Sequence, residues 1–214
     1  MKMVLAVSTR IALLVGLFSQ LGCATESFES HVKRLSNGDE DFAAASRILG
    51  KEGTNTSDET KQAIYHLNAA LERQTSGPDK SVIQTTLAQI HLITLRDCRE
   101  AKRYSSAAVA SDPESDRALE IDVSSDFCFA GITGDYGPVI GRMESLSKQG
   151  REFRLLYSLM GNAYMIRSDQ TNARADMLKA KNAFMKAKQR GEPEASPDAL
   201  ARSIEELERR SRTH

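Results

Sequence analysis

The sequence predicts an all-α fold, and three observations support this. Alanine, leucine, serine, arginine, glutamate and lysine are abundant in the 214 residues, whereas valine and isoleucine are sparse, and this composition favours helix over strand. Apolar residues recur at the spacing of an amphipathic helix in segment after segment. Polar breaks separate these segments and arrange them in pairs. With 40% hydrophobic residues, the chain can build a core as one domain or as a short array.

The first elements follow a polar stretch. Residues 23–39 are polar and lack periodicity, so we expect a tether there, which can contain a short helix. One helix is predicted over 40–50. A second is predicted over 61–74, after a loop in which Ser57 precedes two acidic residues as a capping signal.

The later elements are more regular, and the last two have the clearest apolar pattern. The dipeptide Asp112-Pro113 is expected to end the helix over 96–111, because the residue before a proline disfavours helix. Ser196-Pro197 is expected to begin a final helix with an inward apolar stripe of Leu200, Ile204 and Leu207. Between the helix over 61–74 and this final helix, the predicted helices span 81–95, 96–111, 114–131, 137–149, 151–168 and 171–189.

Small and large residues alternate at fixed offsets between 154 and 189. Tyr157 and Tyr164 lie seven apart on one helix, and Ala173 and Ala180 lie seven apart on the next. Gly161 should cost its helix about 1 kcal/mol relative to alanine. Its position therefore predicts a helix crossing, where Ala173 and its neighbours pack closely against the glycine.

These landmarks, with Met160 and Met177, resemble the tetratricopeptide repeat. The chain departs from the family at Met177, where a larger aromatic is usual, and at Met185, where a proline is usual. Weaker copies begin near residues 42, 82 and 118, the last of them degenerate. The resemblance implies a right-handed solenoid of helical hairpins over residues 40–212, with three or four repeats and a C-terminal capping helix.

The first 22 residues have the features of a signal peptide. Lys2 and Arg10 precede an apolar run over 11–18, which is too short to span a bilayer. Gly22 then precedes Cys23. An ordinary cleaved signal and an uncleaved anchor remain alternatives.

Residues 1–23 resemble a bacterial lipoprotein signal, although Gln20 stands where that family has leucine. The resemblance implies cleavage before Cys23 and acylation of its sulfur, and acyl chains supply stable membrane affinity. Ala24, rather than aspartate, follows the cysteine, which implies the periplasmic face of the outer membrane in enteric-type bacteria.

Two cysteines remain in the mature chain, Cys98 and Cys128. In an oxidising periplasm we expect them to form a disulfide, although two separate buried cysteines are the alternative. No CxxC or HxxxH spacing accompanies them, so we expect no zinc site.

Residues suited to catalysis are scattered. His66 and His91 each stand alone in a helical segment, and no GxSxG, HExxH or phosphate-loop frame occurs. The net charge is zero, with 29 basic and 29 acidic residues, which disfavours nucleic acid as a partner. We therefore expect a non-enzymatic protein without cofactor or metal.

The tetratricopeptide resemblance implies a concave groove lined by the first helix of each unit. The lysine of the family's carboxylate clamp is absent, so we do not expect Asn162 to hold a peptide C-terminus. The groove should be apolar with two acidic residues in its middle, and it should favour an apolar or basic segment of a partner. The alternative is that these residues only pack against the capping helix. The residues assigned to it are Ile83, Thr86, Ile90, Leu119, Asp122, Asp126, Phe129, Leu155, Ser158, Asn162 and Met165.

These inferences lead to one main functional hypothesis. The chain is expected to be a lipid-anchored periplasmic scaffold that recruits a protein partner in envelope, secretion or pilus assembly. One alternative is an enzyme, or a non-catalytic subunit or regulator of a cell-wall enzyme. The other is a mainly structural envelope lipoprotein. The sequence leaves the partner and the oligomeric state open.

Overall fold

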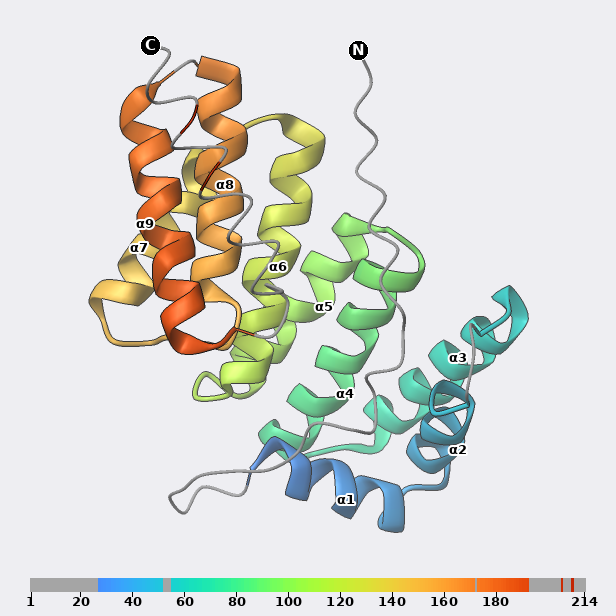
Figure 1. Ribbon diagram of the computed structural model, residues 1–214. Coiled ribbons are helices and arrows are strands. Elements are labelled where there is room, and N and C mark those ends of the chain that lie inside the picture. The colour runs from blue at the N-terminus through green and yellow to red at the C-terminus, as the bar shows by residue number, and fades with distance from the viewer. Residues whose placement is uncertain (1–26, 52–54, 172, 193–204, 206–208, 210–214) are drawn as a thin grey trace.

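The computed structural model describes residues 27–51, 55–171, 173–192, 205 and 209. All regular structure within these ranges is helical, which confirms the predicted all-α class (Figure 1). The signal segment, Cys23 and most of the predicted last helix lie outside the described residues. The elements are α1 Phe28–Gly38, α2 Glu40–Leu49, α3 Ser57–Arg73, α4 Gly77–Gln89, the π-helical turn η1 Ile90–Thr94, α5 Cys98–Ser111, α6 Asp116–Thr133, α7 Gly137–Lys148, α8 Leu156–Thr171 and α9 Arg174–Arg190.

Local capping determines where several helices begin. Thr56 caps α3 in a reciprocal capping box with Glu59, so the cap lies one residue before the predicted Ser57. The side chain of Asp97 caps α5 and that of Ser115 caps α6, each by accepting from backbone N–H groups of the first turn. Prolines at the first turn begin α4 and α7, where the missing N–H is not needed.

Neighbouring helices pack on one another along the chain. The tightest pairs are α2 with α3, α4 with α5, and α8 with α9, and α5 also packs on α6. Figure 1 shows α1 to α3 at one end of the molecule, α4 and α5 in the middle, and α6 to α9 at the other end. Buried apolar side chains form one cluster across α6 to α9 and a second across α1 to α4 that also takes in Tyr104 and Ile121. The α5–α6 contact therefore joins two separate cores.

The prediction of a tether over residues 23–39 is corrected for residues 28–38, where the short helix that it allowed is packed into a core. Residues 28–38 form α1, whose Leu35 is buried in the core of the α1–α4 end. The helix is also held to α4, because Asp79 accepts hydrogen bonds from Arg34 at 2.6 Å and contacts His31 Nδ1 at 2.9 Å. This packed helix forms because apolar residues at helical spacing recur even within the polar stretch.

Gly161 marks a close helix contact, as predicted, but its neighbour differs. A Cβ at this position would lie 2.6 Å from Cε1 of Phe184, in the middle of α9. Ala173, which the sequence placed opposite the glycine, is instead the N-cap residue of α9. The missing side chain of Gly161 thus makes room for the Phe184 ring.

Candidate functional site

Most of the predicted groove residues are used in packing. The apolar ones other than Phe129 lie in the two cores or pack against them, and Asn162 and Met165 on α8 are half-buried. Only a minority can therefore line an open surface, and among the eleven Phe129 is exposed, at 40%. The groove residues that are buried are Ile83, Ile90, Leu119, Asp122, Leu155 and Ser158, and Thr86 and Asp126 are half-buried.

The two acidic groove residues belong to a charge cluster between α5, α6 and α7. Asp122 accepts hydrogen bonds from Lys102 at 3.0 Å, Ser105 at 2.7 Å and Ser106 at 3.0 Å. Its other oxygen accepts from Arg142 Nη2 at 2.6 Å. The side chain of Asp122 is only 4% exposed, whereas those of Lys102 and Arg142 are 33% and 31% exposed, so the carboxylate is shielded from water and both cations stay partly solvated.

Asp126 completes the cluster one turn along α6. It pairs with Lys102 at 2.7 Å and also with Arg142. Two carboxylates thus face two cations of the same chain. The sequence-based preference for a basic partner segment loses its basis, because these charges are already neutralised.

The pKa of Asp122 shows which effect dominates in the cluster. Burial would raise this pKa, but the ammonium of Lys102, the hydroxyl of Ser105 and the guanidinium of Arg142 together lower it below its ordinary value. For Arg142, burial opposes the charged form, but Asp122 and Asp126 raise the pKa of the guanidinium. Asp122 and Arg142 therefore stay ionised at neutral pH, and the cluster holds α5, α6 and α7 together.

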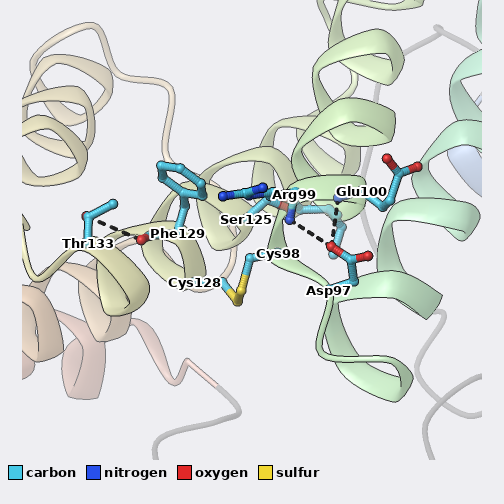
Figure 2. Close-up of a disulfide and its surroundings, with 9 residues drawn as sticks. Asp97, Cys98, Arg99, Glu100, Ser125, Cys128, Phe129 and Thr133 are labelled. Carbon is cyan, nitrogen blue, oxygen red and sulfur yellow. Dashed lines mark hydrogen bonds between the residues drawn. A yellow bond between two sulfur atoms is a disulfide. The ribbon is translucent and has the colours of Figure 1, made fainter.

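A disulfide joins the same two helices, as the sequence predicted. Cys98 is the first residue of α5, and Cys128 lies near the end of α6, with the two Cα atoms 5.7 Å apart (Figure 2). Asp97 caps α5 directly before the bridge and accepts from the backbone N–H of Arg99 and Glu100, both at 3.1 Å. The start of α5 is therefore fixed to α6 by a covalent bond.

The backbone directly before α5 has an unusual conformation. The π-helical turn at the end of α4 is closed by hydrogen bonds from Leu95 N to Ile90 O at 3.1 Å and from Asp97 N to His91 O at 2.8 Å. Arg96 follows with a left-handed φ of 56°. Single π-turns are often found at functional sites, and a non-glycine residue in this region is strained.

Exposed apolar side chains gather on these two tied segments. Ile93 and Leu95, just before Cys98, are 39% and 45% exposed, and Phe129 and Ile132, just after Cys128, are 40% and 64% exposed. We call these four residues the disulfide edge. Of the four, Phe129 stood among the assigned groove residues. Leu95 and Ile132 were missed, because a π-turn and a helix end are not visible in apolar periodicity.

The two isolated histidines have structural neighbours. His66 Nδ1 lies 2.6 Å from Asp41 of α2. His91, in the π-turn, stacks on Tyr104 at 5.5 Å between ring centroids. Burial lowers the pKa of His91, which favours the neutral ring at pH 7.

Neither a metal cluster nor a membrane span is found in the part of the chain that the structure describes. No group of three or more His, Cys, Asp or Glu residues there is placed to hold a metal ion. No helix there is both long enough and apolar enough to cross a bilayer.

Comparisons with protein-family models, with curated proteins and with solved structures find no match to this chain.

Proposed function

We propose that this protein is a lipid-anchored adaptor of the bacterial envelope that holds a protein partner at the disulfide edge. One observation carries the proposal: large apolar side chains are exposed on two segments that a disulfide fixes together. Apolar residues that gather on a surface are typical of interaction sites. Because the bridge already orders both segments, a partner would bind them with little loss of conformational freedom.

The fold that we propose for the adaptor is a solenoid of tetratricopeptide-like hairpins. Its support is the series of packed helix pairs along the chain and the small residues at their contacts, of which Gly161 in α8 is the clearest. Repeats of this kind present extended surfaces for other proteins. The partner surface in this proposal lies at one edge of the central helices rather than in the groove first assigned.

The anchor in this proposal is Cys23, acylated after cleavage of residues 1–22, at the periplasmic face of the outer membrane. A disulfide within the folded part supports an oxidising compartment such as the periplasm. Attachment to a membrane would raise the effective concentration of the adaptor near a membrane-bound partner. Replacement of Cys23 by serine should release the protein from membranes, and its retention would place the anchor elsewhere.

The partner surface can be tested by cross-linking in intact cells. A photo-reactive residue at Ile132 should capture one stoichiometric protein, and Phe129→Glu should abolish the capture. Tyr65→Glu is the matched control, because Tyr65 is 70% exposed on α3, away from the edge. Unchanged capture by the Phe129 variant, or equal loss in the Tyr65 variant, would contradict the assignment of the edge.

A further inference from the structure

Helix α9 presents an apolar line on its outer side. Ala180, Phe184 and Ala187 are buried on the side that faces α8. Leu178 and Met185 lie on the opposite side and are 51% and 42% exposed. Seven residues apart on a helix, they lie about 10 Å from one another along a single line. Figure 1 shows α9 at the outside of its end of the molecule.

The same helix is strongly basic. Its one acidic residue, Asp176, is buried and receives two hydrogen bonds at 2.7 Å from Arg167 of α8, so it does not reduce the outer charge. Arg174 stands four residues before Leu178, and Lys188 three residues after Met185. Both are exposed, and neither forms an ion pair within the described residues. The other basic residues of α9 are Lys179, Lys181, Lys186 and Arg190, of which Lys179 pairs with Glu144 and Arg190 with Glu152.

We infer that this outer face of α9 binds an anionic membrane surface. Cations along a helix with apolar residues between them match a headgroup layer, in which anionic groups lie above the acyl chains. Leu178 and Met185 would enter the headgroup boundary, while Arg174 and Lys188 would meet lipid phosphates at either end. An acidic protein segment is disfavoured, because the apolar line lies on the outer side of α9 rather than in a groove between helices.

This inference concerns a different surface from the disulfide edge and does not depend on acylation of Cys23. It predicts that binding requires anionic lipid and weakens with salt, because surface attraction falls off within a Debye length. Each lysine or arginine at such a surface contributes about a fivefold change in affinity. Replacing Arg174 and Lys188 by glutamine together should therefore weaken binding about 25-fold.

The chain contains no tryptophan, which permits a direct test. Leu178→Trp in the full chain, with Cys23→Ser to remove the acyl acceptor, provides a single tryptophan on this face. With vesicles of phosphatidylcholine and phosphatidylglycerol, its emission should shift to shorter wavelength and be quenched by brominated acyl chains. Vesicles of phosphatidylcholine alone should leave it unchanged. Tyr65→Trp, at an exposed position on α3, should show no shift with either vesicle and controls for the N-terminal segment.

Three results would overturn the inference. Equal shifts with both vesicles, or in both tryptophan variants, would mean that α9 has no selective contact with anionic lipid. An emission that is already shifted without vesicles, at every protein concentration, would mean that another part of this chain covers the face. A shift that grows with protein concentration alone would indicate a second copy of the chain.

Discussion

The α8–α9 hairpin and the α5–α6 junction are both pairs of packed helices, yet different forces hold them. In the hairpin, the ring of Phe184 fills the space left by Gly161, and Ala163, Ala180 and Ala187 are fully buried around the contact. In the junction, Asp122 receives hydrogen bonds from Lys102, Ser105, Ser106 and Arg142, and a disulfide adds a covalent bond. The hairpin relies on close packing, and the junction relies on charge and cross-linking.

This difference corresponds to the position of the two contacts in the molecule. The hairpin lies inside one apolar core, whereas the junction lies where one core ends and the other begins. At this junction, hydrogen-bonded charges and a disulfide help to specify how the two halves meet. It follows that changes at the junction should alter the relation between the halves, and changes in the hairpin should loosen one half only.

The largest effect should come from breaking the disulfide. Replacing Cys98 and Cys128 by alanine opens a loop with a sequence separation of 30. In the chain-entropy model, a loop of this size is worth about 3 to 4 kcal/mol of unfolding free energy. Urea unfolding of the double variant should show this loss, and reductant should produce it in the wild type but not in the variant. An unchanged midpoint in reduced wild type would show that the junction is held by other contacts.

The disulfide was predictable, whereas the charge cluster beside it was not. Two cysteines in a chain that the sequence analysis expects to be periplasmic indicate a pair without any knowledge of geometry. Asp122, however, reads as a solvated acidic residue until α5 and α7 bring Lys102 and Arg142 to it, and such pairing across three helices leaves no periodic pattern. Phe184 was missed for a related reason: a glycine reveals that something approaches, but not which side chain.

Two further features that the sequence analysis missed, helix α1 and the π-turn, have physical causes of their own. Helix α1 is mostly polar, so its few apolar residues gave too weak a periodicity to distinguish a packed helix from a tether. The π-turn before Arg96 needs one extra residue in a helical turn, and composition does not indicate where such a residue is inserted. The helix boundaries elsewhere followed from capping residues and prolines, which act locally.

The second prediction breaks the charge cluster. Asp122→Ala leaves Asp126 as the one remaining carboxylate for Lys102 and Arg142 and should lower the unfolding free energy by about 2 kcal/mol, less than a fully broken buried pair, because both cations keep a partner. Asp116→Ala on the same helix is the control, because its side chain is 72% exposed, and it should change stability by less than about 0.5 kcal/mol. Equal effects of the two variants would show that the cluster is no stronger than a surface pair.

The cluster also predicts a pH dependence. Because the pKa of Asp122 is lowered in the folded state, its stabilisation is complete above the ordinary carboxyl pKa of about 3.9. It is lost as the pH falls below that value and passes the lowered pKa. Asp122→Asn should therefore flatten the fall in unfolding free energy at pH values below about 4, as measured by urea titrations. An equally steep fall in the variant would assign the acid sensitivity to other carboxylates.

The third prediction tests the close packing of the hairpin. Gly161→Leu should force the Phe184 ring out of place and cost about 1 to 3 kcal/mol of unfolding free energy. Adding Phe184→Leu should recover part of this loss. The control is Gly141→Ala in α7, where an added Cβ meets nothing within 4 Å, so the better helix former should stabilise by up to about 1 kcal/mol. Stabilisation at both glycines would show that α8 and α9 pack less closely than described.

The smallest effect should come from the cap at the beginning of α8. Glu192, 4% exposed and just beyond α9, accepts hydrogen bonds from the backbone N–H of Tyr157 at 3.2 Å and of Ser158 at 2.8 Å. The carboxylate satisfies donors that a helix leaves unpaired at its start, and it fixes the hairpin at its open end. Glu192→Gln retains one acceptor oxygen and should cost about 1 kcal/mol. Hydrogen exchange should rise at the amides of Tyr157 and Ser158 and remain unchanged in α5 and α6. Faster exchange in the junction as well would show that the two regions are not held independently.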